Sequence, residues 1–263
     1  MCMVLLVVMT KSIYAQELYV FTEPASNMPA RSIGVRLTNE GTAGSQWSSR
    51  TVPELMIGVN RKLMFHAQGF VSDMDGRYRV EGASLYGKYR FYSADGKRKH
   101  SRAAAFLRIS QSRRTFPSSD INLEGDNSGT QGGLIFTQLL HKLALSADIS
   151  YTRAFGKNRY NGQMNSPHDI IGYSLSSGYL VLPVVYKNYS QPNFNVYFEV
   201  LGKTDPSDGK AYMDFAPAIQ TVINSRTRVD LGYRFQVAGN MDNRYLKNMY
   251  LARVEFNFFN VLK

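Results

Sequence analysis

The chain has 263 residues, of which 44% are hydrophobic and 19% charged, and its formal net charge is +11 at pH 7. This balance excludes a disordered chain, while the 21 Gly, 17 Tyr and 15 Phe favour β structure with tight turns. The positive charge would suit a nucleic-acid binder, an anionic membrane surface or a pore for anions, and does not choose among them.

The first residues have the features of an export signal. A short apolar run, Met3–Met9, is followed at Ile13–Ala15 by a sequence that resembles a signal-peptidase site. The run is too short for a transmembrane helix, which needs about 20 apolar residues. We therefore predict a signal peptide at residues 1–15 and a single mature domain at residues 16–263. The only cysteine, Cys2, falls within the signal, so the mature chain would carry no thiol or disulfide.

The rest of the chain alternates apolar and polar residues with a period of two, which is typical of β-strands. No stretch after the signal is apolar over the length of a membrane helix, and no helical periodicity is sustained. The alternation predicts twelve strands, which in chain order are Ile33–Leu37, Leu55–Val59, Leu63–Val71, Leu85–Phe91, Ala103–Ile109, Leu134–Leu140, Leu143–Thr152, Ile171–Val181, Phe194–Gly202, Met213–Val222, Val229–Val237 and Tyr250–Phe258.

Every second connection between these strands tends to be short, with a link of moderate length at Pro183–Pro192. The short connections are Asn60–Lys62, a hairpin signal at Ala94–Lys97, His141–Lys142 and Asn224–Thr227. The longer, polar ones include Asn39–Arg50, Arg113–Gln131, Gly156–Asp169, Lys203–Lys210 and Gly239–Lys247. This pattern predicts an up-and-down meander with tight turns at one rim and loops at the other.

Two architectures fit the alternation: a soluble sandwich with its apolar residues inside, and a membrane barrel with its apolar residues outside. Three observations favour the barrel. A long open meander leaves strand edges uncovered, the apolar faces carry Tyr and Phe toward the strand ends, and the polar faces hold Gly, Ser and scattered charges. We predict an all-β fold: a closed up-and-down antiparallel transmembrane β-barrel of about 12 strands, in the cell outer membrane of a Gram-negative bacterium.

Particular stretches also resemble a known group of proteins. Ile121–Gly133 (INLEGDNSGTQGG), Gly172–Pro183 (GYSLSSGYLVLP) and the Phe-rich last strand resemble uncharacterised outer-membrane barrels of the Bacteroidetes type, and the layout is similar to the barrel family labelled as the putative MetA pathway of phenol degradation. The resemblance implies contact with outer-membrane lipid, insertion by the barrel assembly machinery and no catalytic residue. Such barrels commonly end on an aromatic residue, whereas four residues follow Phe259 here.

In this barrel the polar faces point into the lumen and supply the candidate pore residues. The predicted lumen-lining set is Arg36, His66, Lys88, Arg90, Arg108, Asp148, Glu199, Asp214, Asp230, Arg234, Arg253 and Glu255. Twelve strands enclose less space than a porin, so the lumen should be narrow. One interpretation is a passive channel or transporter for small solutes, with the charges setting selectivity. The alternative is a structural or surface-interaction barrel with an occluded lumen, whose loops Arg113–Gln131 and Gly156–Asp169 bind a partner.

A lipid-acting barrel enzyme is a third interpretation, which the residues favour least. A serine hydrolase would need Ser and His side by side, yet of the four His only His66 lies within a predicted strand, and no G-x-S-x-G occurs. No spacing suggests a metal site, so we predict no enzyme activity, no cofactor and no metal. The basic clusters, such as Lys97–His100, fall at the predicted periplasmic rim and favour contact with anionic lipid rather than nucleic acid. Trp47 is predicted to anchor the first loop at the membrane interface.

Overall fold

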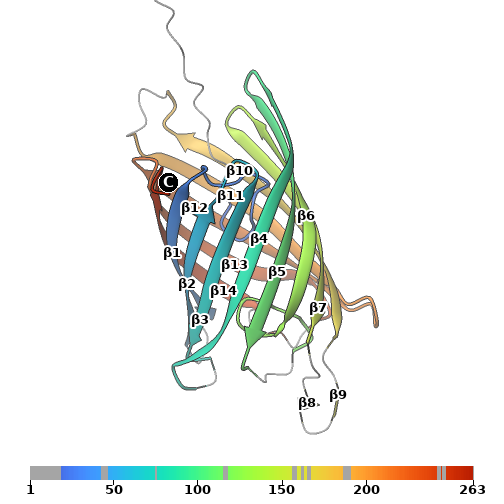
Figure 1. The fold of residues 1–263 in the computed structure, drawn as a ribbon. Coiled ribbons are helices and arrows are strands. Elements are labelled where there is room, and N and C mark those ends of the chain that lie inside the picture. Colours follow the sequence, from blue (N-terminus) through green and yellow to red (C-terminus); the bar gives the residue numbers. More distant parts are fainter. Residues whose placement is uncertain are drawn as a thin grey trace, which may run out of the picture.

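Twelve of the strands that the structure describes close into one barrel (Figure 1). The computed structural model describes residues 19–42, 47–74, 76–114, 118–155, 159–160, 163–164, 167–185, 191–241, 244 and 247–262. The predicted signal peptide at residues 1–15 lies outside these ranges. Within them there is no helix of the length and hydropathy that a membrane span requires.

The strands follow one another around the barrel in chain order. They are β1 (Ser32–Thr42), β2 (Ser48–Gly58), β3 (Leu63–Ser72), β4 (Arg79–Gly96), β5 (Lys99–Ser112), β6 (Gly129–Leu140), β7 (Leu143–Ala154), β10 (Asp169–Leu182), β11 (Asn193–Thr204), β12 (Ala211–Ile223), β13 (Thr227–Gly239) and β14 (Asn248–Phe258). Two further short strands, β8 (Arg159–Tyr160) and β9 (Gln163–Met164), pair outside the barrel. All neighbours are antiparallel, and β14 closes the ring against β1, with Phe258 opposite Ile33. The predicted fold is confirmed, and each of the twelve predicted runs lies in a separate barrel strand.

Two predicted connections are wrong in position because strand pairing continues through them. The hairpin signal at Ala94–Lys97 belongs mostly to β4, whose ladder with β5 extends to the Gly96–Lys99 pair, and the turn falls at Lys97 and Arg98. Arg98 takes the left-handed conformation there, with φ of 61°. Likewise the loop predicted at Asn39–Arg50 shrinks, because β1 and β2 pair as far as Thr42 and Ser48.

The barrel is apolar outside and polar inside, the inverse of a soluble domain. Leu134, Leu231 and Phe256, each on a different strand, are about half exposed (53%, 51% and 45%). By contrast, the largest fully buried side chains are those of Arg50 and Arg228. Outward apolar rows are stable only against hydrocarbon, and a closed ring satisfies every strand edge, which is the condition for crossing lipid with strands. The barrel is therefore a protein of the outer membrane.

The connections β2–β3, β4–β5, β6–β7, β10–β11 and β12–β13 lie at one end of the barrel, here called the turn rim, and the other connections lie at the opposite end, the loop rim (Figure 1). The turn rim is the one predicted to face the periplasm. Trp47, at the loop rim, is exposed and stacks on Tyr250 with ring centroids 4.9 Å apart. Its predicted role as an interfacial anchor stays a prediction.

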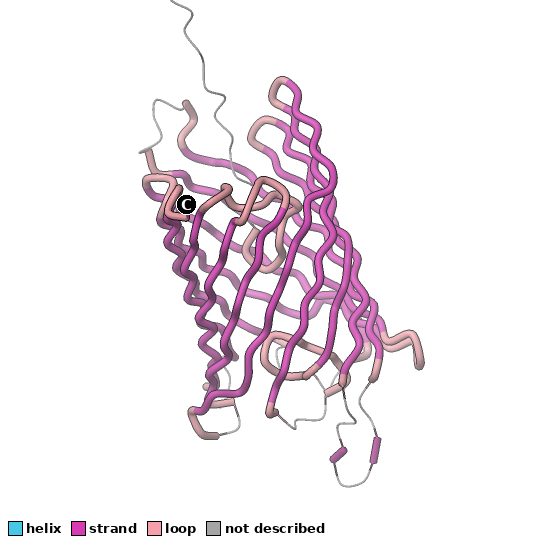
Figure 2. The backbone as a smooth tube through the Cα atoms, in the orientation of Figure 1, coloured by secondary structure: helices cyan, strands magenta, loops and turns pink. Residues whose placement is uncertain are grey.

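Two irregular segments enter the lumen from opposite rims, and Figure 2 draws both as loops within the outline of the strands. The first, here called the strap, is residues 19–31, which precede β1 and come from the turn rim. The second, here called the inner loop, is residues 118–128, part of the connection between β5 and β6. Both make extensive polar contacts with the inner wall, and these contacts define the site.

Candidate functional site

Glu199, on the inner face of β11, holds the tip of the strap. Its carboxylate is fully buried and accepts hydrogen bonds from three successive backbone N–H groups, those of Val20, Phe21 and Thr22, each at 2.9 Å. The Thr22 hydroxyl donates a fourth bond at 2.7 Å. Hydrogen bonds to an ionised acceptor are stronger than neutral ones, so a single side chain supplies much of the affinity of the wall for the strap.

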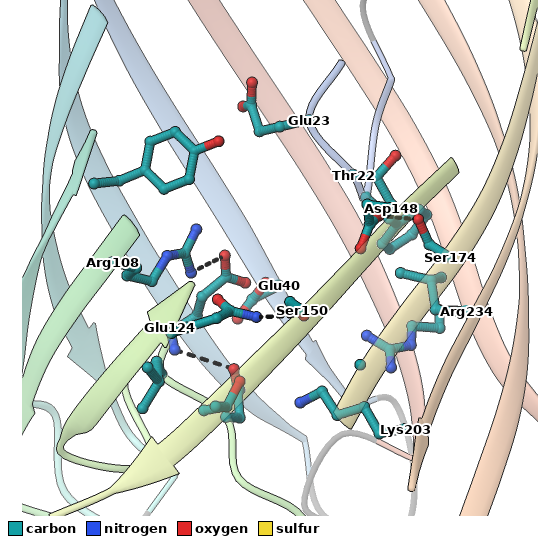
Figure 3. A pocket seen from close by; sticks show the side chains of 18 of the residues that line it. Thr22, Glu23, Glu40, Arg108, Glu124, Asp148, Ser150, Ser174, Lys203 and Arg234 are labelled. Carbon is teal, nitrogen blue, oxygen red and sulfur yellow. Dashed lines mark hydrogen bonds and ion pairs between the residues drawn. The ribbon is translucent and has the colours of Figure 1, made fainter. Parts of the chain in front are cut away.

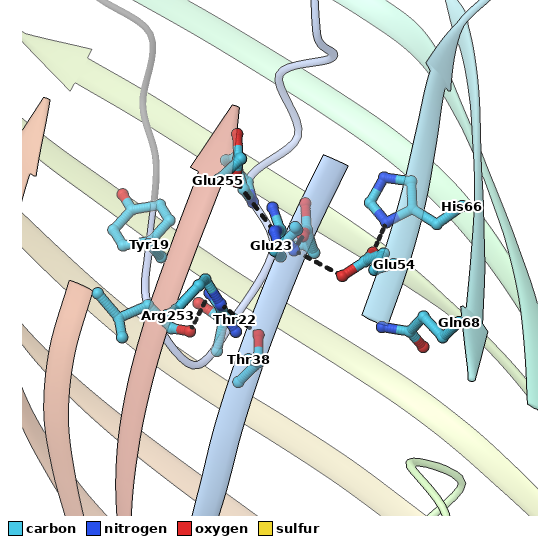
Figure 4. A network of polar contacts seen from close by, with 12 residues as sticks. Tyr19, Thr22, Glu23, Thr38, Glu54, His66, Gln68, Arg253 and Glu255 are labelled. Atoms are coloured by element: carbon cyan, nitrogen blue, oxygen red, sulfur yellow. Dashed lines mark hydrogen bonds and ion pairs between the residues drawn. The ribbon is translucent and has the colours of Figure 1, made fainter. Parts of the chain in front are cut away.

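A second contact fixes the strap through Glu23. Its carboxylate lies 3.2 Å from Arg36 Nη1 on β1 and 3.5 Å from Lys88 Nζ on β4. Figure 4 shows Glu23 of the strap near Glu54 and Glu255 of the wall. The same ammonium group donates to the carbonyl oxygens of Pro24 at 2.6 Å and Ser26 at 2.9 Å. Burial acts to raise the pKa of Glu23, but the positive charges of Lys88 and Arg36 outweigh it and hold that pKa well below its usual range.

Elsewhere the strap is bound by its backbone and by apolar contacts. The Tyr19 carbonyl accepts a hydrogen bond from Arg228, and the Val20 carbonyl accepts one from Arg253 Nη1 at 2.8 Å. The Ala25 N–H donates to the Thr137 hydroxyl at 2.8 Å. Since these partners come from β13, β14 and β6, the strap touches widely separated parts of the wall and obstructs the lumen.

The inner loop is fastened to the opposite half of the lumen by ion pairs. Asp126 accepts hydrogen bonds from both Arg50 and Arg114. Glu124 pairs with Arg108 Nη1 at 2.5 Å, and its carbonyl accepts a bond from Arg50 Nη1 at 2.6 Å. A further pair lies on β11, where Lys203 Nζ is 3.0 Å from the carboxylate of Asp120. The inner loop thus occupies the part of the lumen between the strap and the loop rim.

Between the strap and the inner loop lies a chamber of about 240 Å³ (Figure 3). The strap contributes residues 20–23 to its lining, and the inner loop contributes most of residues 118–126. The wall supplies charges of both signs, including Arg108, Asp148 and Arg234, together with hydroxyl groups such as those of Ser150 and Ser174. Chain segments from both rims therefore narrow the lumen around a polar cavity.

The structure separates the twelve sequence-predicted lumen residues into groups. Six of them line the chamber: Arg36, His66, Arg108, Asp148, Arg234 and Arg253. Lys88 and Glu199 bind the strap instead. Asp214, Asp230 and Glu255 are in ion pairs with wall residues, respectively with Arg234 at 2.6 Å, Arg228 at 2.8 Å and Arg36 at 2.9 Å. Arg90, half-buried on β4, lies beyond Lys88 toward the turn rim and does not line the chamber.

Sequence reasoning missed several residues of the site. Arg50 was assigned to a loop, although it is fully buried and pairs with Glu40, Glu81 and Asp126. Tyr86 lies two residues before Lys88 and therefore on the same face of the strand. This alternation is the feature of the sequence that could have predicted its inward direction. Nothing in the periodicity marks the strap, because its contacts are made by backbone groups and by charges far away in the chain.

Among the described residues, His66 is the histidine that lines the chamber. His66 Nδ1 lies 2.5 Å from Glu54, and no serine hydroxyl among the described residues contacts the imidazole. Nor does any group of three or more His, Cys, Asp or Glu side chains in those ranges form a site for a metal ion.

Comparison with known proteins agrees with the fold. No protein-family model matches the chain, and no curated protein sequence matches it significantly. Among solved structures it is similar to an outer-membrane channel from Pseudomonas putida F1, at TM-score 0.55 and 13% identity over 91% of this chain and 100% of that one. It is also similar to the NanC porin, at TM-score 0.51 and 13% identity over 86% of this chain and 98% of that one.

These likenesses define the class of the protein as an outer-membrane β-barrel. At 13% identity they show the fold alone. The resemblance to Bacteroidetes-type barrels and to the MetA-pathway family stays a prediction.

The ion pairs of the inner loop give its docking a defined pH dependence. Burial acts to raise the pKa of Glu124 and of Asp126, but Arg108 lowers the first and Arg50 with Arg114 lowers the second, so both pKa values lie below their ordinary range. A carboxyl whose pKa is lowered in the folded state stabilises it fully above the ordinary value, and the contribution is lost as pH falls through the folded pKa. Hydrogen exchange of residues 118–128, corrected for intrinsic rates, should stay slow from pH 8 to 5 and rise below about pH 3.

An Asp126→Asn variant provides the control for this pH experiment. Its inner loop should exchange faster already at pH 7, and acid should change it less than the wild type. Protection that is independent of pH in the wild type, or unchanged in the variant, would contradict docking by these ion pairs.

Proposed function

We propose that the protein is a narrow outer-membrane channel for small solutes, closed in the described state by its strap. The observation that carries the proposal is the polar chamber inside a lumen that two chain segments obstruct. The strap is held by hydrogen bonds and ion pairs and is not a strand of the sheet, so it can leave without breaking a single strand pair. Withdrawal of the strap toward the turn rim would connect the chamber to that side.

A passive channel of this kind needs no catalytic residue. Charges that line a narrow passage select solutes by sign and by hydrogen bonding, and the chamber wall carries both signs. We also propose, from the resemblance, that the barrel reaches the membrane through the barrel assembly machinery and carries outer-membrane lipid on its outer face.

A reversible cross-link of the strap tests the channel directly. Thr22 Oγ1 lies 2.8 Å from Ser176 Oγ on β10, so the double variant Thr22→Cys with Ser176→Cys places two sulfurs within bonding reach. In planar bilayers the oxidised variant should conduct at least about ten-fold less than the wild type, and a reductant should restore conductance because the strap can move again. The sole natural cysteine, Cys2, is in the predicted signal and would not interfere.

An oxidised variant that conducts as well as the reduced one would show that the strap does not control passage. Barrels that stay silent in every state would instead favour the second candidate.

That second candidate is a structural barrel, and the obstruction of the lumen by two chain segments is the observation that favours it. In such a barrel the loops would bind a partner. However, the described part of the predicted partner loop Arg113–Gln131 is largely used inside the lumen, where Asp120, Glu124 and Asp126 pair with the wall. This leaves less of that loop for an external surface and favours the channel.

A further inference from the structure

One side of the chamber wall holds buried polar atoms that have no hydrogen-bond partner. Among the described residues these include Tyr86 Oη, His66 Nε2 and Arg108 Nε, and all three residues line the chamber. Tyr86 and His66 are each 4% exposed, and their ring centroids are 5.0 Å apart. The guanidinium of Arg108 lies 5.5 Å from the centre of the Tyr86 ring. The three groups therefore form one cluster on β3, β4 and β5.

This cluster is suited to a hydrogen-bond acceptor. Arg108 Nε can only donate, and the Tyr86 hydroxyl can donate. A buried donor without a partner is unfavourable, so an acceptor group that reaches these atoms is bound with a gain in free energy. A carboxylate can accept from both atoms, and its bonds are charge-assisted; at Arg108 it would use Nε, because Nη1 already pairs with Glu124 at 2.5 Å.

Asp148, on β7, is an acceptor that lacks a cationic partner. Its carboxylate accepts a hydrogen bond from the Ser174 hydroxyl, and no Lys or Arg among the described residues forms an ion pair with it. Figure 3 shows Asp148 beside Ser174 and Thr22 at the chamber wall. A partly buried carboxylate without a cation is unfavourable, so this position suits an ammonium group.

We propose that the chamber binds a small zwitterion, with its ammonium group at Asp148 and its carboxylate at Tyr86 and Arg108. A simple anion would satisfy the donor cluster but would be repelled by Asp148, and a simple cation would leave the donors unpaired. The volume of about 240 Å³ admits a molecule of roughly ten non-hydrogen atoms, given that a 150 Å³ cavity holds benzene. This inference rests on the proposed channel, of which it names the substrate class.

Three probes of nearly equal size separate the two charges. Glycylglycine carries both, N-propionylglycine lacks the ammonium group, and glycylglycinamide lacks the carboxylate. Calorimetric titration of the full purified barrel in detergent should show glycylglycine binding at least about ten-fold more tightly than either of the others. D-glucose, which offers hydroxyls without charge, serves as a fourth probe.

Variants test which side chain binds the ammonium group of the probe and which binds its carboxylate. Asp148→Asn should remove the preference for glycylglycine over N-propionylglycine, and Tyr86→Phe should weaken both probes that carry a carboxylate. Asp208→Asn, in the exposed loop between β11 and β12, is a matched loss of one carboxylate outside the chamber and should change nothing.

Glu199→Gln, which loosens the strap, is titrated in parallel so that access to the chamber does not limit the result. Absence of glycylglycine binding in both this variant and the wild type would overturn the inference, as would equal affinity for the three glycine probes or for D-glucose. If the proposed channel function is wrong but this inference is right, the barrel would bind glycylglycine and yet never conduct in the cross-link experiment.

Discussion

Replacement of Glu199 by glutamine is expected to open the lumen. The amide has the same shape as the carboxylate but is neutral. In the wild type both carboxylate oxygens accept bonds from N–H groups of the strap; in the variant one oxygen is replaced by an NH₂ group, which cannot accept them. Hydrogen bonds to a charged group contribute roughly 1.5–3 kcal/mol each. Loss of the charge should therefore weaken the strap by about 3 kcal/mol or more, which corresponds to a rise of about a hundred-fold in the population with a released strap.

Conductance in planar bilayers and permeation into liposomes measure this rise. Ser177→Ala is the matched control, because Ser177 follows Ser176 on β10 but lies half-buried on the outer face, where its hydroxyl donates to the Phe198 carbonyl. Its conductance should equal that of the wild type. A Glu199→Gln barrel that is folded, as judged by its gel mobility without heating, and still no more conductive than the wild type would contradict the role of Glu199.

Replacement of Arg50 by methionine is expected to have the largest effect on stability. Arg50 is fully buried and pairs with Glu40 at 3.4 Å, with Glu81 at 3.3 Å and with Asp126. Removal of one partner from a buried ion pair costs about 3–5 kcal/mol because an uncompensated charge remains, and here several carboxylates lose the same cation. The inner loop should detach and the barrel should unfold at lower temperature.

Two measurements check this effect of Arg50. The temperature at which the barrel loses its folded mobility on a gel should fall, and a protease added from the loop rim should cut the chain within residues 118–128. Arg153→Met is the control, since Arg153 is 63% exposed in its side chain and lies 3.6 Å from Asp169, a geometry worth about 0–1 kcal/mol. Equal effects of the two substitutions would refute a special role for Arg50.

The strand pattern could be predicted from sequence because a sheet imposes a strict period of two. Leu231 and Phe256 face outward and Glu255 faces inward at the positions that the alternation assigns. The pattern failed at strand ends, as at Asp95 and Gly96, where a turn signal was overridden by continued pairing between β4 and β5. Local turn preference is weaker than several additional ladder hydrogen bonds.

The sequence by itself determined the number of strands and which residues share a face, since both follow from alternation between neighbouring residues, while the aromatic strand ends and the composition of the polar faces favoured a barrel. Only the tertiary structure decided that two chain segments obstruct the lumen and that a chamber remains between them. The contact of Glu199 with Val20 joins residues 179 positions apart, and that of Lys203 with Asp120 joins residues 83 apart. Such contacts leave no period in the sequence, because they depend on where barrel closure brings each strand and not on the neighbours of any residue along the chain.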